Sequence, residues 1–282
     1  MCYFFYFCFM SKGRFNYYDP EYDPKVTDGN ELLLVVNNNT FGFIVSQIRT
    51  KKVLVWGEDY DNDELQNPEA LKDILLGNYS SVKAVVPSVT FTIIPKDLFK
   101  ETDIIEYSRF LTPEPDDVLL TNEFDVTNNV VFAVSKTIME VLKNKLNKAS
   151  IFFAGKVFAA TVNFARHDNA NLYAHIEGNR LQLLYFRNAE FAFYNNFEFN
   201  NPDELMYFVV LTANELGLNL DETSVILSGD VNISDKKIHR VSDLLPKVYL
   251  NQTKMVQLPQ GFLSHQILLL SGLTLCESLV EN

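Results

Sequence analysis

The sequence predicts an α/β protein built from two similar halves, and three observations support this prediction. The segment Asn67-Pro68-Glu69-Ala70-Leu71 is echoed by Asn201-Pro202-Asp203-Glu204-Leu205, and each copy lies between β-rich hairpins and a buried strand. The offset of about 134 residues is far longer than the period of about 20–50 residues that is typical of solenoids. The chain of 282 residues is long enough for two modest domains that each bury a core. We therefore expect two lobes, each a mixed sheet in βββαβ order flanked by helices.

Composition and charge exclude several classes of function. An apolar content of 47% and a charged content of 21% are typical of a globular chain. The formal net charge of −12 argues against a nucleic-acid partner, which needs Lys and Arg to displace phosphate counterions. The three cysteines, Cys2, Cys8 and Cys276, form no CxxC pair, so neither a zinc site nor a disulfide framework is indicated. A reducing cytoplasm fits this pattern best.

The N-terminal segment is interpreted separately from the lobes. Residues Met1 to Met10 are apolar but only about half as long as a membrane span. They lack the positive region and small-residue cleavage site of a signal peptide. Three interpretations stay open: translation starts at Met10, the segment is an extra strand, or it is a membrane-touching tag. Elsewhere no apolar run approaches about 20 residues, so no transmembrane helix is expected.

Residues 1–30 are predicted to be an extended or disordered lead-in, because positions 11–30 are rich in Asp, Pro, Tyr and Asn. Lobe one is predicted over residues 31–167. Its hydrophobic pattern predicts, in order, strands at 32–36, 41–45 and 52–56, an acidic loop at 58–64, a helix from Asn67 to about Gly77, and a strand at 82–86. Asn67 is expected to cap this helix, with Pro68 at its first position, where a missing N–H costs nothing.

The remaining elements of lobe one follow the same reasoning. The pattern predicts a hairpin at 118–134, a helix from Ser135 or Thr137 to Leu146, a strand at 151–154 and a helix at 156–166.

Lobe two is predicted over residues 168–282. It repeats the order of lobe one, with strands at 171–176, 181–186 and 189–194, a helix from Asn201 to about Leu216, and a closing strand at 224–227. Gly217 is expected to end the helix in the left-handed conformation. A helix at 235–245, a strand at 248–250 and a C-terminal helix at 261–275 complete the prediction.

Three short segments carry a resemblance to a known superfamily. Val82–Ser88 looks like a hydrophobic strand that ends in Pro, and Ile176-Glu177-Gly178-Asn179 looks like a phosphate-binding hairpin, normally Asp-x-Gly. Leu227-Ser228-Gly229-Asp230 looks like an adenosine motif in which Asp replaces one of two glycines. With the duplicated βββαβ order, the chain from about residue 30 to its end resembles the actin-like (ribonuclease H-like) ATPase superfamily of actin, Hsp70, sugar kinases and pilus-assembly proteins. More closely, it is similar to a bacterial domain-of-unknown-function family with this fold.

The resemblance implies a nucleotide site at Glu177, Gly178, Ser228, Gly229 and Asp230, but other residues depart from it. The lobe-one hairpin, residues 36–42, has no acidic residue to hold Mg²⁺ through water and no Gly-rich turn to cradle phosphate. Asp230 adds a negative charge beside any phosphate. We therefore expect a catalytically degraded protein without catalytic residues or cofactor, which acts as a protein-interaction or assembly module.

The alternative is an ATP-binding protein or slow ATPase that holds ATP and Mg²⁺ with Glu177, Gly178 and Gly229. A sugar or acid kinase would need a general-base Asp in the cleft, and no motif supplies one.

Other candidate residues have simpler interpretations. His175 and Glu177 point to the same side of one strand, as a metal pair or acid/base couple would, although a surface His beside a turn carboxylate is the simpler interpretation. The aromatic residues at 186–199 are expected to form sheet core, or else an exposed edge that pairs with another protein. No P-loop or Rossmann glycine pattern is present.

Overall fold

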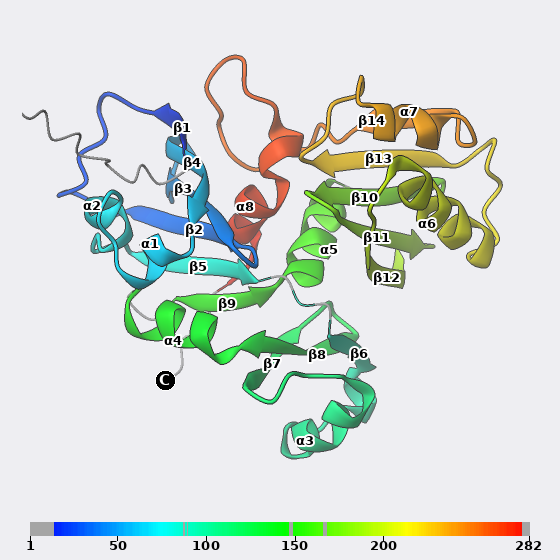
Figure 1. Ribbon diagram of the computed structural model, residues 1–282, viewed down its shortest axis with the longest axis horizontal. Helices are drawn as coiled ribbons and strands as arrows, with labels where there is room; N and C mark the ends of the chain where they lie inside the picture. The colour runs from blue at the N-terminus through cyan, green and yellow to red at the C-terminus, as the bar shows by residue number, and fades with distance from the viewer. Residues whose placement is uncertain (1–13, 87, 89, 147–148, 166–167, 278–282) are drawn as a thin grey trace, which may run out of the picture.

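The computed structural model describes residues 14–86, 88, 90–146, 149–165 and 168–277 (Figure 1). The interpretations of Met1–Met10 and of Pro87 therefore lie outside the described residues. Two α/β lobes lie side by side, and a smaller third sheet lies below them in this view (Figure 1). No helix among the described residues is long and apolar enough to cross a bilayer.

Lobe one contains a six-stranded mixed sheet in the order β1-β4-β3-β2-β5-β9. Strands β2, β3 and β4 form an antiparallel meander, while β5 and β9 run parallel to β2. All seven residues of β2 are buried, as expected for a strand at the centre of a sheet that is covered on both faces. The strands are Arg14–Tyr18 (β1), Asn30–Val36 (β2), Thr40–Gln47 (β3), Val53–Asp61 (β4), Ser81–Val86 (β5) and Ser150–Phe153 (β9).

Lobe two repeats this topology in the order β12-β11-β10-β13-β14. The first two pairs are antiparallel and β10 pairs with β13 in parallel, as β2 does with β5. Both lobes therefore have the expected βββαβ order. The strands are Asn171–Glu177 (β10), Arg180–Arg187 (β11), Glu190–Glu198 (β12), Ser224–Gly229 (β13) and Lys247–Leu250 (β14).

The helix after each meander begins differently in the two lobes. In lobe two, Asn201 caps α6 (Pro202–Glu215) as predicted: its side chain accepts a hydrogen bond of 2.9 Å from Glu204 N. In lobe one the predicted helix from Asn67 is wrong. Two short helices, α1 (Asp63–Gln66) and α2 (Lys72–Leu75), replace it, and Asn67 follows the end of α1. The carboxylate of Glu64 accepts from the N–H groups of residues 69, 70 and 71 at 3.2–3.3 Å, so it holds the turn that precedes α2, a helix without a side-chain cap.

Two helices lie between the lobes (Figure 1). They are α5 (Ala154–Ala165) and α8 (Leu268–Gly272), which pack closely: a Cβ added at Gly272 would lie 2.5 Å from the Thr161 side chain. The predicted C-terminal helix at 261–275 is shorter, because 3₁₀ turns η4 (Ser264–Ile267) and η5 (Leu273–Leu275) flank α8. The larger core extends from the lobe-one strands into one face of the lobe-two sheet. A second core lies on the other face, with residues of α6 and α7 (Lys236–Ser242).

A segment after β14 returns from lobe two to lobe one. We call residues 251–263 the return loop. Gln257 pairs with Lys52, the residue before β4, and Gln257 N donates to Lys51 O at 2.7 Å. Met255 and Val256 are buried in the larger core. The predicted boundary between lobes at 167/168 remains a prediction, because part of the C-terminal segment packs with lobe one.

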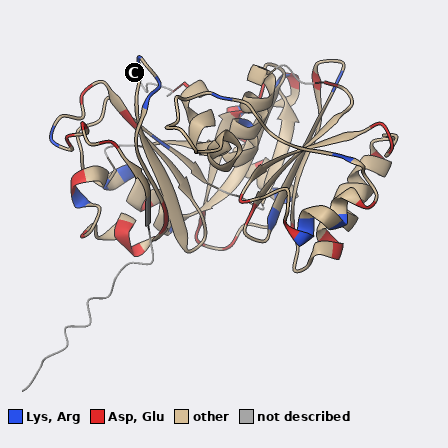
Figure 2. Cartoon of the chain, turned by 90° about the horizontal axis from the view of Figure 1, so that it is seen from above, with Lys and Arg blue, Asp and Glu red and all other residues tan. Residues whose placement is uncertain are grey.

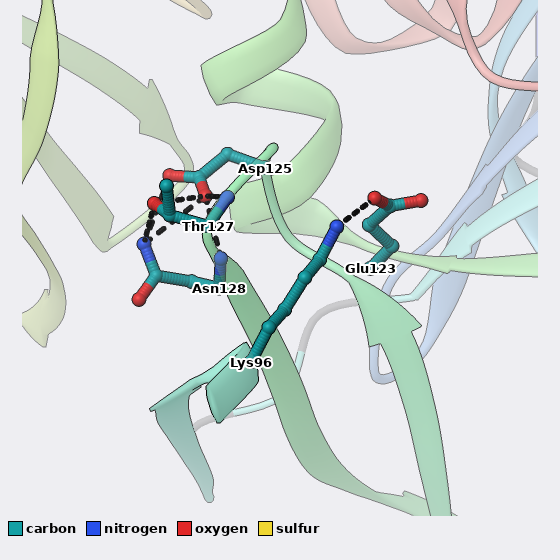
Figure 3. Close-up of polar contacts among 5 residues, drawn as sticks. All are labelled: Lys96, Glu123, Asp125, Thr127 and Asn128. Carbon is teal, nitrogen blue, oxygen red and sulfur yellow. Dashed lines mark hydrogen bonds and ion pairs between the residues drawn. The ribbon is translucent and has the colours of Figure 1, made fainter. Parts of the chain in front are cut away.

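The third sheet, in the order β6-β8-β7, is inserted between β5 and β9 and was only partly predicted. The hairpin of β7 (Asp117–Glu123) and β8 (Asn128–Ser135) was expected, whereas β6 (Phe91–Pro95) was not. Asp125 organises the hairpin turn, since its carboxylate accepts from the N–H groups of Thr127 and Asn128, each at 2.7 Å (Figure 3). An ion pair of Lys96 with Glu123 joins the ends of β6 and β7 (Figure 3).

The other helices of this region are short. The insert carries η1 (Lys96–Leu98), η2 (Glu101–Asp103), α3 (Ile104–Tyr107) and η3 (Ser108–Phe110), and α4 (Lys136–Asn144) leads from β8 towards β9. The side chain of Asn122 fastens the insert to lobe one, because its amide donates to Ile151 O at 3.2 Å and accepts from Phe153 N at 2.7 Å.

The lead-in predicted for residues 1–30 contains an unpredicted strand. β1 pairs antiparallel with β4 and covers the edge of the lobe-one sheet. The residues after it are also held in place. Asp19 is 2.6 Å from the Lys52 ammonium, and the hydroxyl groups of Tyr22 and Tyr79 are 2.8 Å apart.

Candidate functional site

A cavity of about 730 Å³ lies between the lobes. The turns of two equivalent hairpins line it: Asn37–Asn39 between β2 and β3, and Gly178–Asn179 between β10 and β11. The end of β13 and the helical turns before and within α8 line it as well. The cavity lies at the ends of the central strands of two matching sheets.

Four of the five predicted site residues line this cavity: Glu177, Gly178, Gly229 and Asp230. Gly229 has φ +90°, and a Cβ at this position would lie 2.0 Å from Ile176 O. The same carbonyl accepts a hydrogen bond of 2.7 Å from Asp230 N. Close approach of β13 to β10 therefore requires glycine here. Gly178 has φ +57° but open space around it, so only its backbone conformation favours glycine.

Ser228, the fifth predicted residue, is fully buried beneath the cavity. Its hydroxyl lies 3.0 Å from Nδ1 of His175, and it also contacts Ala174 O at 3.3 Å. Burial lowers the pKa of His175 to about 3, so the imidazole is neutral and the pair joins β10 to β13. The interpretation of His175 as a surface residue is wrong, since it is 3% exposed. Within the described part of the chain no three His, Cys, Asp or Glu side chains lie close enough to hold a metal ion.

A hydrogen bond across the cavity joins the two lobes. Asn37 Nδ2 donates to Glu177 Oε1 at 2.9 Å, which links the equivalent hairpins. Asn62 holds the lobe-one turn from behind, because its amide donates to Asn37 O at 2.9 Å and Asn38 O at 3.1 Å. The sequence identified the turn but not this contact.

The environment of Glu177 disfavours its charged form. Burial is the main cause that raises its pKa, and the negative charges of Glu58 and Asp230 act in the same direction. The Asn37 hydrogen bond and the positive charge of Arg180 oppose this shift. Burial therefore outweighs the stabilisation that Asn37 and Arg180 give to the charged carboxylate.

The cavity differs in charge from the outer surface. Its lining includes five carboxylates but one guanidinium, that of Arg180, which lies 3.8 Å from Glu198. The carboxylates belong to Glu58, Asp59, Glu177, Glu198 and Asp230. The outer helices of both lobes, by contrast, carry both signs of charge (Figure 2).

Comparisons with known structures identify the fold. The chain is similar to a Bacteroides thetaiotaomicron protein described as having an actin-like ATPase fold and unknown function, with 15% identity over 91% of this chain and 99% of that one, and a TM-score of 0.74. It is also similar to a chain of the PilM–PilN type IV pilus biogenesis complex, with 12% identity over 89% and 98% of the two chains and a TM-score of 0.55. At these identities the likeness shows the fold alone, and it confirms the predicted actin-like fold.

Sequence comparison adds the family. No curated protein matches the sequence. A family described as "Protein of unknown function (DUF3822)" matches residues 19–248. The chain belongs to the DUF3822 family, and its fold is that of the actin-like ATPases.

Proposed function

We propose that this chain is a catalytically degraded actin-like protein that acts as a protein-interaction or assembly module. The observation that carries the proposal is the hydrogen bond of 2.9 Å between Asn37 and Glu177. Phosphoryl transfer needs backbone N–H groups, a cation and positioned positive charge around the phosphates. Here the two hairpins instead bond each other through a neutral amide and a carboxylate.

The charge of the cavity supports the same proposal. A bound triphosphate would lie among the carboxylates of Glu58, Glu177 and Asp230. Two like charges about 4 Å apart near a protein surface repel by about 4 kcal/mol. Arg180 already contacts Glu198, so little positive charge remains to offset this repulsion.

The role as an interaction module is supported by the insert and by one relative of the fold. The insert exposes large apolar side chains, a feature typical of interaction surfaces when such side chains cluster. They are Leu98 (68% exposed), Ile105 (77%), Phe110 (77%) and Val126 (88%). The similar chain in the PilM–PilN structure is part of an assembly.

The alternative is an ATP-binding protein or slow ATPase. Two observations favour it. The cavity volume of about 730 Å³ is within the range of about 300–1,000 Å³ that is typical of ligand pockets. Gly229, which lines this cavity, allows β13 to approach β10 closely.

Isothermal titration calorimetry and thermal shift with ATP and Mg²⁺ separate the two functions. The proposal expects no heat and no shift of the melting temperature at millimolar nucleotide. A Mg²⁺-dependent shift that saturates would refute it in favour of the alternative.

Affinity purification from native cells tests the module itself. The wild-type chain is compared with Phe110→Ser and with Val26→Ser, a matched control at an exposed apolar residue outside the insert. The proposal expects partners that are lost with Phe110→Ser and retained with Val26→Ser. Recovery of the same proteins with all three chains contradicts a docking role for the insert.

A further inference from the structure

We propose that the cavity between the lobes binds a peptide segment of a protein partner, with an Arg or Lys side chain placed among its carboxylates. This inference rests on the proposed function, because it names the chemistry by which a partner is recognised.

The first argument is the balance of charge. Five carboxylates and one guanidinium line the cavity, which gives a formal charge of 1 − 5 = −4. A cleft lined by one sign of charge focuses the field and raises the local concentration of ligands of opposite sign. Such a cavity repels phosphate and carboxylate ligands and attracts a guanidinium or ammonium group.

The second argument is the state of Glu177 at the centre of this cavity. Its side chain is half-buried, and among the described residues it accepts a hydrogen bond from the neutral amide of Asn37. Burial is the main cause that raises its pKa, and the charges of Glu58 and Asp230 act in the same direction. The Asp230 carboxylate has no hydrogen-bond or ion-pair partner among the described residues. A ligand cation between these groups would relieve the repulsion and make charge-assisted hydrogen bonds.

The third argument is independent of charge and concerns Trp56. Its side chain lines the same cavity and is 2% exposed, yet its Nε1 has no hydrogen-bond acceptor among the residues that the structure describes. A buried N–H without an acceptor is unfavourable. A peptide carries a backbone carbonyl close to each of its side chains. A small rotation of the Trp56 side chain on binding, of a kind common at interfaces, would bring the indole N–H to such a carbonyl. A free polyamine offers no acceptor, so a peptide fits better.

The aromatic wall of the cavity supports a cationic group as well. The rings of Trp56 and Phe262 meet edge to face with their centroids 5.2 Å apart, and both residues line the cavity. A guanidinium or ammonium group is attracted to the face of an aromatic ring, most strongly to that of Trp.

The test uses the full chain, calorimetry and intrinsic fluorescence. Trp56 is the single tryptophan of the sequence, so its emission reports directly on the cavity. The probes are a capped Gly-Ser-Arg-Ser-Gly peptide, the same peptide with Gln in place of Arg, spermidine, and ATP with Mg²⁺. We expect the Arg peptide to bind and to change the Trp56 emission, and the Gln peptide to bind at least about tenfold more weakly, as the loss of a charge-assisted contact predicts.

Two matched variants locate the site. Glu177→Gln keeps an oxygen that can accept from Asn37 and should weaken Arg-peptide binding about tenfold. Glu215→Gln removes a carboxylate on exposed α6 and should leave binding unchanged. Equal binding of both peptides, spermidine binding as tight as that of the Arg peptide, or equal affinity of both variants would each overturn the inference. Absence of peptide binding would overturn this inference but not the proposed function, whereas ATP binding would overturn the proposed function.

Discussion

Replacement of Gly229 by Ala tests how closely β13 approaches β10. At φ +90° an L-residue is strained, at a cost of about 1–2 kcal/mol. The new Cβ would also lie 2.0 Å from Ile176 O, so the backbone must move. That movement would weaken the hydrogen bond of 2.7 Å from Asp230 N to the same carbonyl, worth about 1 kcal/mol. We expect Gly229→Ala to lower the free energy of unfolding by about 3 kcal/mol.

Gly178→Ala is the matched control, because it makes the same substitution at φ +57° with no atom within 4 Å of the new Cβ. Only the backbone strain applies there, so we expect a loss of about 1 kcal/mol. Urea unfolding followed by Trp56 fluorescence and by circular dichroism measures both variants. Equal losses in the two variants would refute the argument from close approach, because the strain at positive φ is common to both.

Three further perturbations follow from other contacts. Asn37→Ala removes the amide that donates to Glu177, so we expect calorimetry to show a loss of about 1–2 kcal/mol in stability. Asn38→Ala, at an exposed position of the same turn, should change the stability little. Equal losses in the two variants would contradict a specific link between the lobes. The raised pKa of Glu177 means that the folded chain holds this proton more tightly than the unfolded chain, so its contribution to stability is present below the ordinary value of 4.5 and is lost as the pH rises through the folded pKa. The difference in melting temperature between wild type and Glu177→Gln should therefore shift in favour of the variant as the pH rises, and a difference that is constant with pH would be inconsistent with this reasoning. Lys83→Met leaves Glu31, which is 2% exposed, with Lys51 at 3.2 Å as its one cation among the described residues, so we expect a loss of about 3 kcal/mol in urea unfolding. The double variant with Glu31→Met should largely restore stability; failure to recover would show that packing or the lost hydrogen bond from Lys83 to Leu273 O, rather than charge, causes the loss.

Local signals in the sequence predicted the fold where the structure depends on neighbouring residues. Helix α6 begins at the predicted position because Asn201 bonds to Glu204, three residues away. The equivalent prediction at Asn67 failed: this residue follows the end of α1, and Glu64 of α1 accepts hydrogen bonds from the N–H groups of residues 69, 70 and 71 in the turn before α2. Strand β1 escaped prediction because its partner is distant: Tyr18 pairs with Val55 of β4. The composition of residues 11–30 does not indicate that pairing.

The position of the candidate site residues was predicted in part. The resemblance of two short segments to superfamily motifs singled out Glu177, Gly178, Gly229 and Asp230, and these four residues line the cavity, while their role in binding stays a prediction. The burial of Ser228 could not be predicted, because it depends on contact with His175 in a neighbouring strand. The bond of Asn37 to Glu177 joins residues 140 positions apart, and nothing in either hairpin alone indicates the other.

The return loop has a consequence for synthesis of the protein on the ribosome. Lobe one is the first to emerge, yet part of its core and the bridge to Lys52 come from Met255, Val256 and Gln257. Domains usually fold in the order of their translation, N-terminal first. Here the early half of the nascent polypeptide acquires these buried side chains only after the strands of lobe two have been synthesised. A ribosome stalled before residue 251 would therefore carry a first half that has not finished folding.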